Sequence, residues 1–306
     1  MLTNLIAVPT GTAYTVKINY ATNKDTQAIN WLTPEQTAGK KLPYMFTQCE
    51  PIHCRAVAPL QDTPAIKATY TASVTVAKQY KVKMSAVDKD QTNVDDQHIK
   101  YTFEQTIPIA SYLLAMAVGD LAEKKVGDRT AVITEPSMLD ACATELVDLE
   151  LSLKAMEDYL TPYIWGTYNV LVLPPSFPFG GMENPLMTFA SPTIIVGDKS
   201  QVYVATHEIA HSWTGNEVTC ENWSNMWLNE GFTVFEERNV TAKLQNSEDF
   251  SKVASILGNA DLQDAIKSYG PDSSFGSLYP IHNGKSPDES FSTIPYEKGY
   301  QFLYYL

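Results

Sequence analysis

The sequence has 306 residues, a length typical of about two domains, and its hydrophobic content of 44% is sufficient for a well-packed core. This composition excludes a disordered or collagen-like chain, and the formal net charge of −13 at pH 7 argues against nucleic acid as a partner. No apolar run approaches the roughly 18 residues that a membrane span needs, so we expect no membrane partner either.

The first 119 residues are predicted to form an antiparallel β domain (1–119). Apolar side chains alternate with smaller or polar ones over Tyr14–Tyr20, and the same period of two returns over Ala68–Val76 and Ile99–Phe103. Turn-rich segments such as Asp88–Asp96 separate these runs. Such alternation is typical of an antiparallel sheet with one face exposed to water.

The pattern changes to mixed helix and strand in the second predicted domain, residues 120–306. We expect one long helix over about 140–160, and then a buried strand over Asn169–Leu173, because that apolar run is short, unbroken and rich in β-branched residues. Two further helices are predicted over about 201–214 and 224–244. The sequence thus predicts an α+β protein.

The last part of the chain combines an irregular segment with a helical pattern. Gly, Pro, Ser and Asp are dense over 268–289, which predicts a loop. An apolar helical pattern begins at Tyr296 and continues to Leu306 without a capping residue or a polar tail. Because such a helix needs a packing partner, we expect this chain to be a fragment of a longer one.

The four cysteines lack the spacing of a disulfide framework or of a thiolate zinc site. Unpaired cysteines of this kind are typical of a reduced compartment, so we expect a cytoplasmic protein. The residues are Cys49, Cys54, Cys142 and Cys220.

The sharpest chemical signal is the pattern HExxH, which places His207 and His211 one helical turn apart, so that both imidazoles can reach one metal ion. A tetrahedral catalytic zinc needs three protein ligands and one open position. Glu230, on the next predicted helix, is positioned to be the third ligand. The alternative is two histidines with ordinary helix contacts. We expect one Zn²⁺ ion.

Two further glutamates accompany the predicted ligands. Glu208 follows His207 but points away from the ligand face, so it is placed to act as the general base that takes a proton from the attacking water. Glu237 lies on the same helix face as Glu230, where it could orient a ligand histidine. A solvated or salt-bridged Glu237 is the alternative.

A second signal is the segment Gly180, Gly181, Met182 and Glu183. Two glycines allow a backbone to approach a ligand closely, and extended backbone here could pair with a bound peptide. Glu183 would add a negative charge beside that peptide. By pattern alone, the segment could equally be a turn with an exposed acid.

Together these motifs resemble the zinc aminopeptidases of the aminopeptidase N type, the gluzincins, and within them the leukotriene A(4) hydrolase branch. The order is GGMEN at Gly180–Asn184, HExxH at His207–His211 and then Glu230. The resemblance implies a saddle-like N-terminal β domain, a thermolysin-like catalytic domain and a C-terminal helical domain, of which we expect the first to be incomplete and the last to be missing. Supporting stretches are Trp31–Gln36, Thr47–Glu50, Ile52–Ala56, Leu173–Pro178, His211–Gly215 and Pro295–Gly299.

The resemblance also implies roles for individual residues. Glu183 would bind the free α-amine of the substrate, and Glu50 would share that subsite at a position that is often Gln in the most similar relatives. Tyr296 would donate a hydrogen bond to the oxyanion. Asp288 matches an aspartate linked to epoxide hydrolysis, whereas Phe291 stands where that branch has a tyrosine lining its lipid pocket.

The resulting hypothesis is a zinc-dependent aminopeptidase that removes N-terminal residues from short peptides with a free N-terminus. A bifunctional epoxide hydrolase is the second enzyme hypothesis. A non-catalytic zinc-binding fragment is the third hypothesis, and it belongs to a different class. In all three, the missing C-terminal helical domain of the same chain would be a structural partner.

Overall fold

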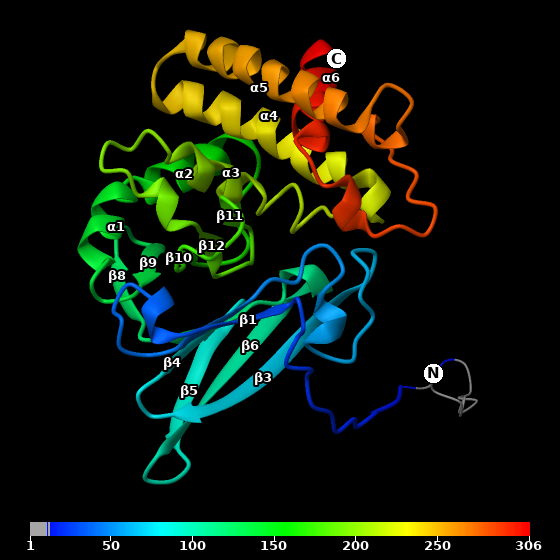
Figure 1. The fold of residues 1–306 in the computed structure, drawn as a ribbon. Helices are drawn as coiled ribbons and strands as arrows, with labels where there is room; N and C mark the ends of the chain where they lie inside the picture. Colours follow the sequence, from blue (N-terminus) through cyan, green and yellow to red (C-terminus); the bar gives the residue numbers. More distant parts are fainter. Residues whose placement is uncertain (1–10, 12) are drawn as a thin grey trace.

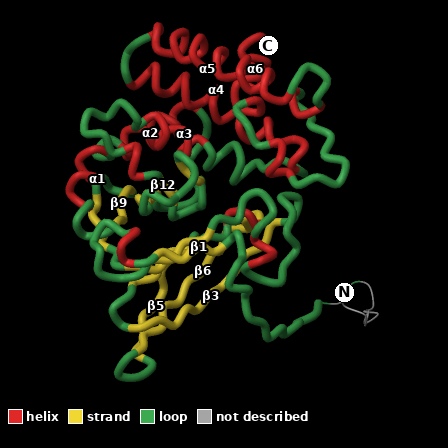
Figure 2. The backbone as a smooth tube through the Cα atoms, in the orientation of Figure 1, coloured by secondary structure: helices red, strands yellow, loops and turns green. Residues whose placement is uncertain are grey.

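The computed structural model describes residue 11 and residues 13–306, and it confirms the α+β class. The strands of the first half of the chain lie on one side of the molecule, and the helices lie on the other side together with the strands of the second half (Figure 1). Figure 2 shows the same arrangement, with most of the helical residues gathered above the long strands of the first half. Glu50 from the first half and His207 from the second line the same cleft.

The strands before residue 120 form two antiparallel sheets. One has the order β1-β2-β7-β4 and the other the order β3-β6-β5. Their bounds are β1 Ile29–Leu32, β2 Tyr44–Thr47, β3 Lys67–Ala77, β4 Lys81–Met84, β5 Val87–Asn93, β6 His98–Ala110 and β7 Met116–Gly119.

The long hairpin pair confirms two predicted strands and corrects a third segment. Ala68–Val76 lies in β3 and Ile99–Phe103 in β6, and the two strands pair antiparallel. Asp88–Asp96, predicted to be turn-rich, instead lies largely in β5, all of whose residues are exposed. Hydrogen bonding to β6 outweighs the poor strand propensity of this polar sequence at the sheet edge.

The predicted strand over Tyr14–Tyr20 is wrong, because residues 13–23 belong to no strand or helix. Its alternating residues are exposed, and Val16 has an exposed fraction of 77%. An alternating pattern forms a strand only when a neighbouring strand supplies backbone partners. None of the strands in the described part of the chain pairs with this segment.

The third sheet has the order β11-β12-β10-β9-β8 and belongs to the second half of the chain. The predicted strand Asn169–Leu173 is confirmed as β10, which is buried between parallel neighbours. The switch from the first sheet to this one occurs between β7 and β8, beside the domain boundary at 119/120, which stays a prediction. The bounds are β8 Ala122–Lys125, β9 Thr130–Thr134, β10 Tyr168–Val172, β11 Gly181–Met182 and β12 Thr188–Ala190.

The single helix predicted over 140–160 is wrong in its continuity. The chain forms α1 (Leu139–Glu145) and α2 (Leu149–Tyr159), separated by a break at residues 146–148. Leu146 and Leu149 are both fully buried in one cluster with Leu153. Leu146, within the break, and Leu149, at the start of α2, thus pack into the same core, so the helix is interrupted without exposing either side chain.

The two helices around the HExxH segment are confirmed, as α3 (Tyr203–Ala210) and α4 (Met226–Leu244). The helix from Tyr296 is confirmed within α6 (Ile294–Tyr305). The predicted loop 268–289 is largely irregular, with two short 3₁₀ turns. The structure adds a helix that the sequence patterns did not predict, α5 (Glu248–Tyr269).

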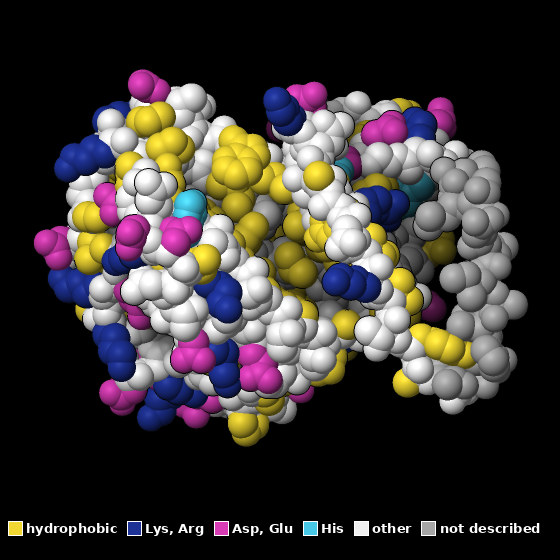
Figure 3. All heavy atoms as spheres, turned by 90° about the horizontal axis from the view of Figure 1, so that it is seen from below, with side chains coloured by type: hydrophobic (Ala, Val, Ile, Leu, Met, Phe, Trp, Pro, Cys, Tyr) yellow, Lys and Arg dark blue, Asp and Glu magenta, His cyan; other side chains and the backbone are white. Residues whose placement is uncertain are grey.

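Helix α4 is the centre of the helical side, since it packs against α2, α3, α5 and α6. None of the helices in the described chain is long and apolar enough to cross a membrane. On the β3–β6–β5 side, Lys, Arg, Asp and Glu side chains are intermingled over the face shown in Figure 3.

Two apolar clusters hold the functional elements in place. One joins the first sheet to the third through Phe46, Phe177 and Phe189, whose rings meet edge to face. The other packs Ile209 of α3 and Val240 of α4 on the third sheet. Burying a side chain of this size stabilises the fold by about 1.5–3 kcal/mol. The helices that carry HExxH and Glu230 are therefore fixed to a rigid base.

Candidate metal centre and substrate cleft

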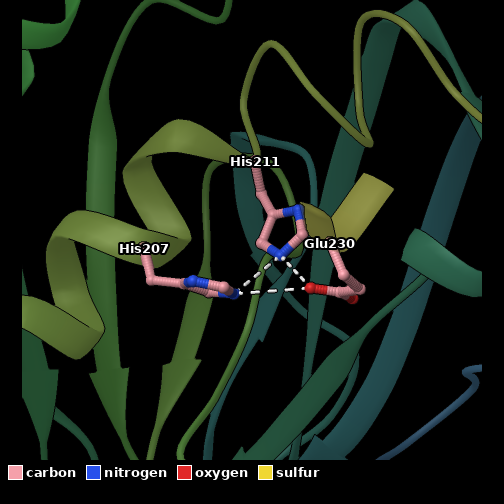
Figure 4. Close-up of side chains that lie close together, drawn as sticks. All are labelled: His207, His211 and Glu230. Carbon is pink, nitrogen blue, oxygen red and sulfur yellow. Dashed lines mark hydrogen bonds and ion pairs between the residues drawn. The ribbon is translucent and has the colours of Figure 1, made fainter. Parts of the chain in front are cut away.

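The three predicted metal ligands converge in the structure. His207 lies in the last turn of α3, His211 caps that helix, and Glu230 projects from α4. The two Nε2 atoms lie 3.1 Å apart, and Glu230 Oε2 lies 3.1 Å from His211 Nε2 and 3.5 Å from His207 Nε2 (Figure 4). All three ligand atoms thus surround one point, as an ion requires.

The other ring nitrogen of each histidine faces an oxygen acceptor. His207 Nδ1 lies 3.3 Å from Glu237 Oε2. His211 Nδ1 lies 2.9 Å from the carbonyl of Thr214 and 3.1 Å from Thr233 Oγ1. When Nδ1 donates to these oxygens, the lone pair of each Nε2 points into the space between the three ligands. Glu237 therefore contacts His207, and its role in orienting a metal ligand stays a prediction.

The charges around this point favour a cation. Although burial lowers the pKa of His207, its hydrogen bonds with Glu230 and Glu237 raise that pKa to about 9. Although burial raises the pKa of Glu230, the two imidazoles bring it down to about 2. In the metal-free protein a proton is thus retained at this place. Two imidazoles and a carboxylate also form a donor set that suits Zn²⁺, so the residues fit that ion.

Glu208 lies beside the predicted ligands without joining them. Its side chain is buried, its Oε2 has no hydrogen-bond partner in the described structure, and burial raises its pKa to about 8. Strand β11 passes directly over it, so that any side chain at position 181 would overlap the carboxylate. Gly181 is therefore required for Glu208 to reach the cleft.

Glu183 and Glu50 are two more acids of the cleft. Glu183 is 4% exposed, and the side-chain amide of Asn216 holds its backbone carbonyl at 2.7 Å. The Oε1 atoms of Glu183 and Glu50 are both buried without a hydrogen-bond partner within the described residues. Burial and the neighbouring acids raise the pKa of Glu50 well above its ordinary value. The pair would accept a positively charged group.

All of these side chains line one cleft of about 440 Å³. Gly180 and Met182 belong to its wall, and Tyr296 closes it beside His207, with ring centroids 6.0 Å apart and an interplanar angle of 23°. Burial and the nearby acids raise the pKa of Tyr296 well above its ordinary value. Its hydroxyl therefore keeps its proton at neutral pH and can donate a hydrogen bond.

Asp288 does not line this cleft. Its Oδ1 lies 3.1 Å from His53 Nε2, and the side chain is 45% exposed. It borders a smaller, mainly apolar cavity of about 230 Å³, which adjoins the cleft at Glu50 and Phe291 and also includes Trp223. A substrate-binding role for Asp288 stays a prediction.

The sequence patterns missed two residues that shape the site. Thr233 Oγ1 lies within hydrogen-bond distance of His211 Nδ1. The sequence feature that could have indicated this contact is the position of Thr233 one turn after Glu230 on α4. The side-chain amide of Asn216 donates a hydrogen bond to the backbone carbonyl of Glu183. The sequence feature that could have indicated it is the short distance along the chain from Asn216 to His211. Neither contact follows from the residue type alone.

Comparison with known proteins agrees with this architecture. Residues 146–306 match the sequence profile of the Peptidase family M1 domain, and residues 2–113 match that of the Peptidase M1 N-terminal domain. The chain is 45% identical over 293 residues to leukotriene A-4 hydrolase of Xenopus laevis, covering 95% of this chain and 48% of that protein. It is 47% identical over 307 residues to leucine aminopeptidase 2 of Neurospora crassa, covering 98% and 46%.

A solved structure gives the same result. Yeast LTA4 hydrolase in complex with bestatin superimposes with a TM-score of 0.85 at 41% identity, over 93% of this chain and 44% of that one. An M1 zinc metallopeptidase from Deinococcus radiodurans shares the fold with a TM-score of 0.65 at 23% identity. This chain spans about half the length of the curated relatives it matches.

Proposed function

The chain belongs to peptidase family M1, and we propose that the protein is a zinc-dependent aminopeptidase that removes N-terminal residues from short peptides with a free N-terminus. One observation carries the proposal: three side chains that could hold a cation share a cleft with two buried acids, Glu183 and Glu50, whose Oε1 atoms have no hydrogen-bond partner among the described residues. The first feature suits metal-assisted hydrolysis. The second suits the ammonium group of a peptide N-terminus.

His207, His211 and Glu230 would hold a single Zn²⁺ ion, with Glu237 orienting His207. A zinc ion bound in this way lowers the pKa of its water to about 7 and polarises a carbonyl.

Glu208 would take the proton from the attacking water and pass it to the leaving amine. Its buried, unpartnered Oε2 is available to accept that proton. A divalent charge nearby lowers the pKa of a carboxyl group, so the raised pKa of about 8 in the metal-free protein would move toward neutrality. A general base works best when its pKa is close to the working pH.

Glu183 and Glu50 would bind the substrate ammonium, and Tyr296 would donate a hydrogen bond to the oxyanion. Fixed donors of this kind act without reorganisation during the reaction. A peptide whose amine is blocked would leave both acids buried and unpaired, which is a strong basis for rejecting it. These contacts would make the enzyme an exopeptidase.

The test is hydrolysis of a panel of aminoacyl chromogenic substrates, each measured with its N-acetylated counterpart, alongside metal analysis. We expect about one zinc per chain and turnover of the free-amine substrates only. Equal turnover of the acetylated substrates, or turnover without bound metal, would contradict the proposal.

Epoxide hydrolysis is the second candidate, and the observation in its favour is the apolar cavity that adjoins the cleft at Glu50 and Phe291. Incubation with a lipid epoxide, followed by a search for the diol, tests it. The position of Asp288 outside the cleft favours peptide hydrolysis as the main activity. A non-catalytic zinc-binding role would be indicated by bound zinc without turnover of either substrate class.

Three further predictions belong to this proposal. The domain bounds 1–119 and 120–306 coincide with the change of sheet between β7 and β8. A helical domain would pack on the apolar side chains of α6, of which Tyr305 is 86% exposed. A cytoplasmic location is supported by four free cysteines, all of them buried.

A further inference from the structure

Helices α4 and α6 touch backbone to backbone at a pair of glycines next to the catalytic residues. Gly231 directly follows Glu230 in α4, and Gly299 lies one turn after Tyr296 in α6. A Cβ built on Gly231 would lie 2.8 Å from the Cα of Gly299, and one built on Gly299 would lie 2.8 Å from the Cα of Gly231. No side chain therefore fits between the two helices at this crossing.

A buried ion pair holds the same turn of α6 from a second direction. Arg238 Nη2 of α4 donates to Glu297 Oε1 at 2.6 Å, and both side chains are almost fully buried. The guanidinium also lies 4.2 Å from the ring centroid of Tyr300. Helix α5 closes the third side at Gly258, where any side chain would overlap the Glu297 carboxylate.

These contacts differ from ordinary helix packing because they lie next to Tyr296 in α6. Glu297 directly follows Tyr296, and Gly299 is on the next turn, so both fix the part of α6 that carries the Tyr296 ring over His207. Toward its far end α6 is less buried: Phe302, whose ring contacts Trp227, is 45% exposed, and Tyr305 is 86% exposed.

We propose that Gly299, seated on Gly231, and Glu297, paired with Arg238, are positioning residues that set the place of the Tyr296 hydroxyl relative to the three metal ligands. The proposal rests on the proposed function, because it concerns the donor role of Tyr296 in that reaction. The close approach of Gly231 and Gly299 would thus contribute to catalysis as well as to helix packing.

A methyl group at position 299 should act through Tyr296. Ordinary contact begins at about 3.4 Å, whereas the Cβ would lie at 2.8 Å, so α6 must move away from α4. Helix α4 is held by α2, α3 and α5, so the ligand Glu230 should stay in place while Tyr296 moves. A displacement of about 1 Å in a reacting group can cost about 10²-fold in rate.

The experiment is a double-mutant cycle in the protein at its natural length, with Gly299→Ala and Tyr296→Phe alone and together. We expect Gly299→Ala to lower kcat by about 10- to 100-fold, with KM and zinc content nearly unchanged. We expect the double variant to be no slower than Tyr296→Phe alone, since the hydroxyl that Gly299 positions is already gone. Gly276→Ala is the matched control, because a methyl there meets nothing within 4 Å.

Losses in kcat that multiply in the double variant would overturn the proposal, as would an unchanged kcat for Gly299→Ala. If Gly299→Ala fails to fold, Glu297→Gln in the same cycle decides, because it preserves the shape of the side chain while removing the charge that pairs with Arg238. Unchanged kcat in Tyr296→Phe would overturn the proposal together with the donor role. Zinc-dependent turnover of free-amine substrates would still support the proposed function.

Discussion

Two groups of glutamates in the second half of this protein show opposite behaviour. Glu150 and Glu157 of α2 both bind Arg129, whose guanidinium makes a two-point contact with Glu157 at 2.7 and 3.0 Å. In the cleft, Glu183 Oε1 and Glu208 Oε2 have no hydrogen-bond partner among the described residues. Hydrogen bonds from Arg129 lower the pKa of Glu157, whereas burial raises the pKa of Glu183 and Glu208.

The difference shows what each group contributes. A paired carboxylate near the surface stabilises the fold, while a buried carboxylate without a cation lowers stability unless a ligand supplies the charge. Under the proposed function, cations would complete the site: a metal ion at His207, His211 and Glu230, and a substrate ammonium at Glu183. The following predictions test this contrast.

Removal of the metal should have the largest effect on the activity of the cleft, and it should leave the ion pairs of Arg129 with Glu150 and Glu157 unchanged. We expect dialysis against a chelator to abolish turnover and to lower the melting temperature, because an ion bound only to the folded state stabilises it. Thermal unfolding and activity before and after addition of Zn²⁺ provide the measurement. Full turnover in the metal-free protein would show that the cluster does not hold the catalytic ion.

Glu208→Gln should separate binding of the metal from catalysis. The amide preserves the shape beside Gly181 but cannot accept the proton from water, so we expect kcat to fall by about 10² to 10⁴-fold with zinc content unchanged. Stability should rise slightly, because an unpaired buried acid is removed. Metal analysis, steady-state kinetics and urea unfolding check the three parts. Wild-type turnover would exclude Glu208 as the base.

The convergence of His207, His211 and Glu230 could be predicted from the sequence because it depends on local geometry. Helical spacing alone aligns His207 with His211, and one returning helix suffices to bring Glu230 to them. Thr233 and Asn216 could not be predicted in the same way. Their contacts depend on the turn that follows α3, whose shape is fixed by packing across the chain.

The incorrect predictions of secondary structure have a similar cause. The alternation over Tyr14–Tyr20 predicts a strand, but strand formation depends on a partner that the pattern does not contain. Conversely, the polar segment Val87–Asn93 becomes a strand because β6 pairs with it. Helix α5 was missed since apolar residues such as Ile256, which is 71% exposed, do not mark a single buried face.

Glu183→Gln should weaken recognition of the free amine. We expect kcat/KM on free-amine substrates to fall by about 10²-fold, the effect of removing one partner of a buried charge pair. Glu50→Gln is the matched comparison and should lose less, because burial and the neighbouring acids already raise the pKa of Glu50 well above its ordinary value, so the substitution removes less negative charge. Equal losses for free and acetylated substrates would show that neither acid binds the amine.

Loss of the ion pairs that Arg129 forms with Glu150 and Glu157 should have the smallest effect, and it should change only stability. Arg129→Met leaves two carboxylates without their cation, so we expect the free energy of unfolding at pH 7 to fall by about 1–3 kcal/mol, with activity unchanged. Lys124→Met is the control, because the pair of Lys124 with Asp140 is largely exposed and should contribute less.

The pH dependence of that loss follows from the direction of the pKa shifts. Burial raises the pKa of Glu150, but its hydrogen bonds from Arg129 outweigh this, so the pKa values of Glu150 and Glu157 both lie below the ordinary 4.5 in the folded protein. Their contribution is therefore complete above pH 4.5 and is lost as the pH falls through the lowered values. Urea unfolding of the wild type and Arg129→Met should give curves that converge in acid. A difference that grows below pH 4.5 would contradict the assignment of these acids to a stabilising role.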